Sequence, residues 1–268
     1  MSGSQELLPR FTGRHVVNHL VMLVCFVGLV LTGLPQKFAD HMWAKGLVLL
    51  FGGVERTRWL HHVLGTVMAL QLVWHLLEGV WLHLVRRLPM PMMPALKDVL
   101  DFRDQVRFNL GFAADPPRMD RYTFAEKIEY LALVWGTAVM VLTGLVLLYP
   151  VRWVNLVPGE VILAAKAAHG GEALLALLSI LTWHVYFVHV RQWNTSIFKR
   201  RLAVEPYVEE HPLEVERLRR DGHPRPAALQ AWRVVVFAAV AAAIILVSVA
   251  VVWWLRVVPA GAEVVTRF

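Results

Sequence analysis

The sequence predicts an all-α integral membrane protein, a helical bundle with five transmembrane helices. Hydrophobic residues make up 57% of the 268 residues and charged residues only 18%, whereas soluble globular chains are about 45–50% apolar and about 25% charged. The apolar residues gather in five runs, each near the roughly 20 residues that cross a bilayer as a helix. Most Lys and Arg residues lie between these runs, which is typical of membrane proteins.

The five runs lie at about 16–34, 60–82, 128–149, 163–190 and 234–255. The first is too long for the apolar part of a signal peptide, and it ends without a small-residue cleavage site. The high apolar content excludes a disordered chain, and the single cysteine, Cys25, excludes a disulfide scaffold. Membrane lipid is an expected partner and nucleic acid is not, because the basic residues separate apolar runs.

Basic residues predict the orientation of the bundle. The N-terminal arm, the 83–127 segment and the 191–233 segment together hold 19 Lys and Arg, and the segments on the opposite side hold 8. Cytoplasmic segments are enriched in basic residues, so the N-terminus is expected in the cytoplasm and the C-terminus outside. We interpret both long cytoplasmic loops as lids or docking surfaces, because neither is long or apolar enough to form a domain.

The chain is expected to have three parts. Residues 1–190 form a four-helix core that includes the cytoplasmic loop 83–127. Residues 191–231 form a cytoplasmic connecting segment, and residues 232–268 form the fifth transmembrane helix and an external tail.

Histidines inside the apolar runs point to chemistry, because ionisable side chains in a bilayer are costly and usually functional. The third and fifth runs carry none. The first run carries or adjoins His15 and His19, the second carries His61, His62 and His75, and the fourth carries His169, His184 and His189.

Helical spacing arranges these histidines in two layers. A helix turns about 100° and rises about 1.5 Å per residue, so His61 and His75 share one face of their helix, about 21 Å apart. His169 and His184 share a face about 22 Å apart. Given the predicted orientation, His61 and His169 lie near the outer surface, and His75, His184 and His19 lie near the cytoplasm.

Two layers of facing imidazoles predict two b-type haems held between the first, second and fourth helices, because opposing histidines bind haem iron from both sides. We expect His61 and His169 to ligate an outer haem iron. His184 is expected to ligate an inner iron together with His19 or His75. The sequence has no Cys-x-x-Cys-His motif, so attachment through thioethers is excluded. A third haem would recruit His189.

Two smaller patterns add to this picture. The run Val30 to Leu34 (VLTGL) recurs at Val141 to Leu145, and each copy precedes a histidine-bearing helix by 26–29 residues. Its Thr-Gly pair is interpreted as close helix packing. Glu172 lies three residues after His169 and is expected to orient it. His211 is interpreted as a loop residue without a ligand role.

Several motifs resemble a known family, over about residues 10–218. Asn18-His19, Leu31 to Leu34 and Leu60 to Gly65 resemble the first two helices of the membrane cytochrome b subunits of formate dehydrogenases and nickel–iron hydrogenases. The closest resemblance is to cytochrome b/b6-domain proteins associated with multihaem c-type cytochrome complexes. It rests on the runs His169 to Ala176, Trp183 to Tyr186, Pro117 to Lys127 and Glu209 to Glu214.

The resemblance implies a dihaem cytochrome b in a bacterial inner membrane. It would transfer electrons across the membrane between quinone and an extracytoplasmic partner, either a multihaem cytochrome c or an iron–sulfur or dehydrogenase subunit. In the dehydrogenase subunits the inner haem is ligated from helices 1 and 4, which implies His19 and His184. A cytochrome b6-like arrangement would use His75 in place of His19. Any quinone oxidoreductase activity is expected only within a complex.

Quinone and its protons are expected near the inner haem, at Arg14, His15 and His189, with Glu172 as a further candidate for proton handling. Three alternatives stay open. The first is a stand-alone b561-like quinone or ferric reductase. The second is a haem-free, proton-coupled transporter lined by histidines. The third is a passive membrane anchor for a soluble enzyme.

Overall fold

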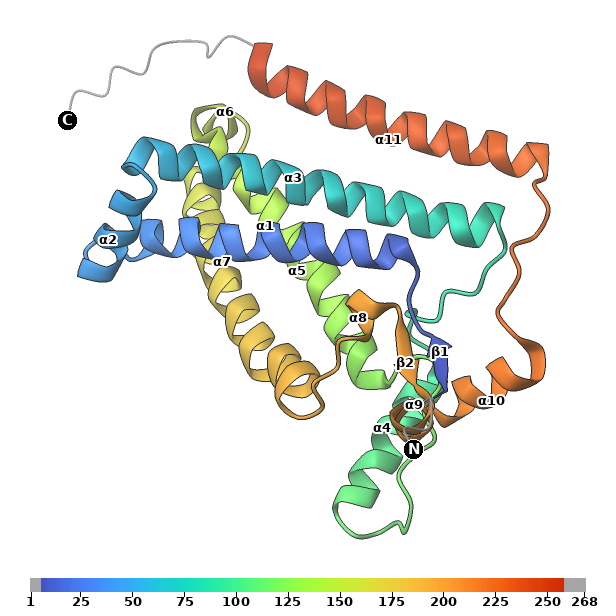
Figure 1. The fold of residues 1–268 in the computed structure, drawn as a ribbon. Coiled ribbons are helices and arrows are strands. Elements are labelled where there is room, and N and C mark those ends of the chain that lie inside the picture. The colour runs from blue at the N-terminus through green and yellow to red at the C-terminus, as the bar shows by residue number, and fades with distance from the viewer. Residues whose placement is uncertain (1–5, 258–268) are drawn as a thin grey trace, which may run out of the picture.

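The computed structural model describes residues 6–257, which are mostly helical (Figure 1). Residues 258–268, where the external tail is expected, lie outside the described residues. The helices are α1 (Gly13–Lys37), α2 (Met42–Leu50), α3 (Val54–Val80), α4 (Leu96–Asn109), α5 (Phe124–Leu148), α6 (Pro150–Val154), α7 (Gly159–Ser179), α8 (Ser196–Lys199), α9 (Val204–Glu210), α10 (Pro212–Asp221) and α11 (Ala231–Val257). Two π-helical segments, η1 (Trp81–Val85) and η2 (Ile180–Val190), continue α3 and α7, and the strands β1 (Leu7–Pro9) and β2 (Arg201–Ala203) pair antiparallel.

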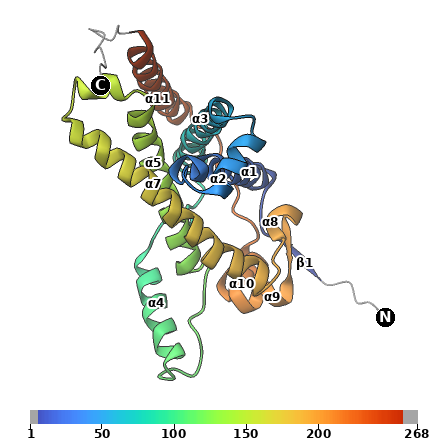
Figure 2. The same ribbon diagram turned by 90° about the vertical axis from the view of Figure 1, so that its left-hand side faces the viewer.

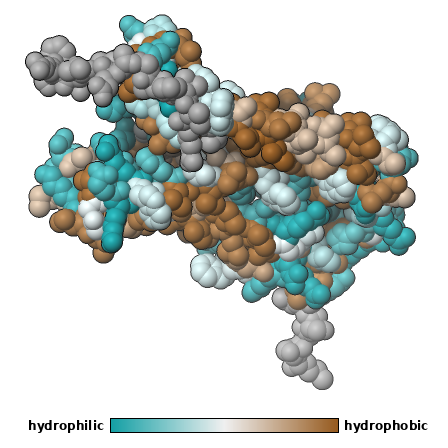
Figure 3. Space-filling model, turned by 90° about the horizontal axis from the view of Figure 1, so that it is seen from above, coloured by the Kyte–Doolittle hydropathy of each residue, from teal (hydrophilic) through white to brown (hydrophobic). Residues whose placement is uncertain are grey.

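Five helices among the described residues are long and apolar enough to cross a membrane. They are Gly13–Lys37, Val54–Val85, Phe124–Leu148, Gly159–Val190 and Ala231–Val251. Each begins three to six residues before its predicted apolar run, because polar residues form the first helical turn and carry no hydropathy signal. At most 11% of the apolar window of each helix is buried within the protein. The broad hydrophobic areas that result (Figure 3) identify a multi-pass membrane protein.

The spanning helices pack as two pairs with a fifth helix beside them. Helix α1 packs on α3, and α5 packs on α7. In Figure 2 the α1–α3 pair is seen nearly end-on, and the α5–α7 pair runs across it. Helix α11 contacts the first pair mainly through η1, where the rings of Trp81 and Phe237 lie 4.9 Å apart.

The extramembrane elements gather at the two ends of the bundle (Figure 1). The small β1–β2 sheet and helices α4, α8, α9 and α10 lie at one end, whereas α2 and α6 lie at the other. The three segments rich in Lys and Arg, which the sequence assigns to one side of the membrane, therefore lie at one end of the bundle.

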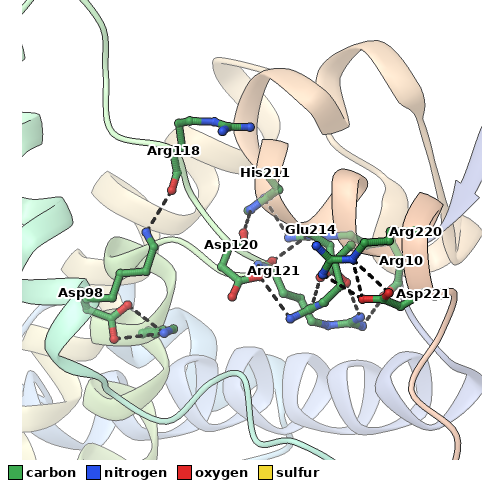
Figure 4. Close-up of polar contacts among 12 residues, drawn as sticks. Arg10, Asp98, Arg118, Asp120, Arg121, His211, Glu214, Arg220 and Asp221 are labelled. Atoms are coloured by element: carbon green, nitrogen blue, oxygen red, sulfur yellow. Dashed lines mark hydrogen bonds and ion pairs between the residues drawn. The ribbon is translucent and has the colours of Figure 1, made fainter.

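The two long loops are tied to the N-terminal arm (residues 6–12) by a polar cluster, which we call the polar clasp. Its members are Arg10, Arg121, Glu126, His211 and Glu214, of which Arg10, Arg121, His211 and Glu214 are labelled in Figure 4. Arg10 donates to the Arg121 carbonyl (2.9 Å), to Glu126 Oε1 (3.2 Å) and to His211 Nε2 (3.0 Å). Arg121 donates to Glu214 Oε1 (3.0 Å) and to the Arg10 carbonyl (2.8 Å). The loop residues that form the clasp hold the loops to the N-terminal arm. For these residues, the interpretation of both loops as lids or docking surfaces is corrected.

One residue of the clasp, Glu126, also caps the N-terminus of the spanning helix α5. Thr123 Oγ1 accepts from the Glu126 N–H (3.1 Å), and Glu126 Oε2 accepts from the Thr123 N–H (2.7 Å). This reciprocal capping box satisfies two N–H groups at the start of α5. Glu126 therefore fixes where α5 begins and also anchors Arg10, which lies just before α1.

His211 lies between α9 and α10, as the interpretation as a loop residue expects, but it is buried, with 2% of its surface exposed. Its Nδ1–H donates to the Asp120 carbonyl (2.7 Å), so Nε2 is the unprotonated nitrogen that accepts from Arg10. Burial, followed by the charge of Arg10, lowers the pKa of His211 from 6.5 to about 4.

This pKa shift predicts a pH-dependent clasp. Between pH 6.5 and about 4, His211 binds a proton in the opened clasp but not in the closed clasp. The free energy of opening the clasp is therefore highest above pH 6.5. This free energy of opening falls by roughly 1–3 kcal/mol as the pH drops toward 4. Hydrogen exchange of residues 7–12 and 207–215 in detergent measures the change. The variant His211→Asn keeps a donor for the Asp120 carbonyl and should lose most of this pH dependence, and an equal slope in both proteins would contradict the prediction.

Two histidine pairs as the candidate functional site

The structure brings His61 of α3 next to His169 of α7. Their ring centroids lie 6.3 Å apart, with 70° between the ring planes. Each ring contacts a threonine of a neighbouring helix through Nδ1: Thr32 Oγ1 lies 3.0 Å from His61 Nδ1, and Thr143 Oγ1 lies 2.9 Å from His169 Nδ1. We call this arrangement the outer pair.

The threonines determine which nitrogen of each imidazole carries the proton. Thr32 Oγ1 donates its single hydrogen to the Gly28 carbonyl (2.7 Å), and Thr143 Oγ1 donates to the Val139 carbonyl (2.7 Å). Each hydroxyl therefore accepts from the Nδ1–H of its histidine. The Nε2 atoms of both rings keep their lone pairs, which is the form of imidazole that binds a metal.

A glycine follows each of these threonines and leaves room for the adjacent ring. A Cβ atom at Gly33 would lie 2.9 Å from His61 Cε1, and one at Gly144 would lie 3.3 Å from His169 Cε1. The repeated VLTGL run therefore does more than pack helices. Each copy supplies a hydroxyl and a glycine to one histidine of the outer pair.

Substitution of Gly33 and of Gly144 by alanine should affect stability unequally, because the space for the added methyl group differs. Gly33→Ala should displace the His61 ring, because a gap of 2.9 Å is too short for a carbon–carbon contact. Gly144→Ala, at 3.3 Å from His169, should be tolerated with a small shift of the ring. Melting of the two variants in detergent, compared with Gly46→Ala, where no neighbour lies within 4 Å, measures the difference. Equal melting of Gly33→Ala and Gly46→Ala would contradict it.

A second pair lies toward the end of the bundle that holds the polar clasp. The rings of His19 (α1) and His184 (η2) lie 6.4 Å apart, with 33° between their planes. His184 Nδ1 donates to Glu129 Oε1 of α5 (2.6 Å). His19 Nδ1 is buried, and no hydrogen-bond partner for it is found among the described residues. We call this arrangement the inner pair.

Both pairs have the spacing that one iron atom between two imidazoles requires. Two metal–nitrogen bonds of about 2 Å each, with about 1 Å from each nitrogen to its ring centre, place the centroids about 6 Å apart. The donor set, two imidazoles brought together from different helices, also fits a b-type haem. Within residues 6–257 no three His, Cys, Asp or Glu side chains cluster to hold a bare metal ion. Along α1, His19 and Thr32 are about 20 Å apart, so the pairs form two separate layers.

Other predicted residues have different surroundings. His75 Nε2 lies 2.8 Å from the Tyr130 hydroxyl, so the structure brings His19, and not His75, next to His184. His15 Nδ1 accepts from the Thr12 N–H (3.1 Å) and caps the start of α1. Glu172 lies against Gly136, and the expectation that it orients His169 is corrected, because Thr143 holds that ring.

His189 lies closer to the inner pair than α-helical spacing predicts. An α-helix would place it about 140° from His184. Instead, both residues stand in η2, whose backbone hydrogen bonds run from residue i to residue i+5. Residues five apart then lie nearly above one another, and the two rings are 6.4 Å apart at 80°.

Polar side chains continue from the inner pair toward the start of α1. Arg14 pairs with Glu78 (3.2 Å), and Asn18 donates to Glu78 Oε2 (2.9 Å). A pocket of about 510 Å³ opens here, lined by Thr12, Gly13, Arg14, Val17, Asn18 and Trp74. This end of the bundle therefore offers charged and apolar surfaces close together.

No known protein family matches the chain, and no curated protein matches it either. The geometry of the two histidine pairs is therefore the main guide to function.

Proposed function

We propose that this chain is a dihaem b-type membrane cytochrome that transfers electrons across the bilayer, between an extracytoplasmic redox partner and the quinone pool. The observation that carries the proposal is the presence of two facing imidazole pairs, His61–His169 and His19–His184, each at the spacing for one iron. They lie at two depths on helices long enough to cross a membrane.

Neighbouring side chains bind the Nδ1 atoms of three of the four histidines, so that Nε2 is the nitrogen available to iron. Thr32 and Thr143 accept the Nδ1–H protons of the outer pair, and Glu129 accepts that of His184. These bonds fix the ring orientations and leave the Nε2 atoms free to bind iron. Haem iron, when bound, supplies reversible one-electron exchange, and its potential depends on ligands, burial and hydrogen bonds.

Residues at the start of α1 support a quinone site near the inner pair. The pocket beside Arg14 and Asn18 has an apolar wall at Val17 and Trp74 and lies at the same end of the bundle as His19. The Arg14–Glu78 ion pair and the Asn18 amide supply groups that can bind a carbonyl or hold a proton. The end that carries α2 and α6 would then face the extracytoplasmic partner.

The haem content of the purified chain tests the proposal. The pyridine haemochrome assay should give about two haem b per polypeptide, with split α-bands in the reduced-minus-oxidised spectrum. A ratio near three would recruit His75 and His189. No haem in protein from cells that can insert it would overturn the proposal and favour a histidine-lined, proton-coupled transporter.

A further inference from the structure

The four paired histidines differ in what holds their Nδ1 atoms. In the outer pair both partners are hydroxyl groups, from Thr32 and Thr143. In the inner pair His184 bonds to a carboxylate, and His19 Nδ1 is buried without a partner among the described residues. The two layers thus share one ligand type but differ in the charge beside it.

The carboxylate of Glu129 contacts the imidazole of His184. Its Oε1 atom lies 2.6 Å from His184 Nδ1, and 23% of its side-chain surface is exposed. Among the described side chains, no Lys or Arg nitrogen lies within ion-pair distance of this carboxylate. Glu78, which lies on α3, differs in this respect, because Arg14 and Asn18 neutralise and bind it.

A carboxylate at this position makes the imidazole a stronger donor to iron. Accepting the Nδ1–H draws the proton away from the ring and raises the basicity of Nε2. The negative charge also stabilises the oxidised iron, which carries one more positive charge than the reduced iron. Neutral hydroxyl partners, as at His61 and His169, have neither effect to the same extent.

We infer that Glu129 is a positioning residue that makes the inner haem the lower-potential one of the two. The inference rests on the proposed function, because it presupposes iron between His19 and His184. It assigns to Glu129 a role that no hydropathy or spacing pattern of the sequence indicates. It also predicts the order of reduction, with the outer site reduced first in a potentiometric titration.

The first test assigns the two potentials. In the double variant His61→Ala/His169→Ala, which lacks the outer ligands, the remaining haem should titrate with the lower of the two wild-type potentials. If the remaining haem has the higher potential, the inference is overturned. This experiment needs no change at Glu129.

The second test removes the charge and keeps the shape. Glu129→Gln still offers an oxygen to the His184 Nδ1–H. It should shift the reduction equilibrium of the lower-potential haem at least tenfold toward the reduced form, about 59 mV for a one-electron couple. The higher potential should stay unchanged. Glu129→Asp, which keeps the charge, should restore most of the wild-type value.

Glu172→Gln is the matched control, because it removes a carboxylate from another spanning helix, where it lies against Gly136. It should leave the inner potential unchanged. Two haems with unchanged potentials in Glu129→Gln would overturn the inference and leave the proposed function intact. A shift of the lower potential in Glu172→Gln equal to that in Glu129→Gln would have the same meaning. A wild-type protein without haem would instead overturn the proposed function itself.

Discussion

Under the proposed function, alanine at any one of His61, His169, His19 or His184 is expected to remove one of the two proposed haems and to abolish electron transfer across the membrane. Each substitution would leave one of the two proposed iron sites with a single imidazole, because it deletes a ring whose partner ring lies 6.3–6.4 Å away. Loss of one site breaks the path, because the layers are about 20 Å apart. Haem content and reduced-minus-oxidised spectra of the four purified variants measure the effect.

Two neighbouring histidines provide controls for this prediction. His62 follows His61 in the chain but is exposed, and His75 bonds to Tyr130. His62→Ala and His75→Ala should therefore keep both haems. Loss of a haem in His75→Ala, together with two haems in His19→Ala, would show that His75 is the inner ligand and would contradict the assignment made here.

Removal of the Glu214 carboxylate should open the polar clasp. Glu214 is fully buried, accepts from Arg121 (3.0 Å) and pairs with Arg217. Glu214→Ala leaves the guanidinium of Arg121, which is 17% exposed, without its acidic partner. Breaking a buried pair in this way costs about 3–5 kcal/mol. Hydrogen exchange of residues 119–123 and 207–217 should rise accordingly.

Glu216 provides the matched control for this experiment. It lies on the same helix as Glu214 and pairs with Arg118, but both side chains are more than half exposed. An exposed ion pair contributes at most about 1 kcal/mol, so Glu216→Ala should change exchange only slightly. Similar exchange in the two variants would mean that Glu214 does not hold the clasp together.

The parts of the fold that depend on local pattern could be predicted from the sequence. Five spanning helices follow from apolar length alone. The depth and face of His61, His169 and His184 follow from helical rise and turn. These quantities belong to a single helix, so no knowledge of its neighbours is needed.

Contacts between distant segments could not be predicted in this way. Helical register places His75 on the same face as His61, but only packing decides that α5 brings Tyr130 to it. The polar clasp joins residues 111 and 201 positions apart, and loop sequences carry no periodicity that would indicate such contacts. The position of His189 depends on the π-helical winding of η2, whereas the prediction assumed an α-helix.

Some sequence signals carry more than one meaning. The repeated VLTGL run indicates close packing, and its position before two histidine-bearing helices also indicates partners for His61 and His169. Glu129 gave no comparable signal, because it lies in the first turns of α5, where acidic residues are common for reasons of helix stability.

The pairing of β1 with β2 has a consequence for the order in which the protein assembles during synthesis. Leu7 pairs with Ala203, so the N-terminal strand has no partner until 196 further residues have been made. At translation rates of about 5–20 residues per second, this delay is roughly 10–40 s. Helix α1 therefore enters the bilayer with its leading end unanchored. A nascent chain arrested between η2 and β2 would expose the N-terminal arm to protease, whereas one arrested after α10 has emerged would protect it.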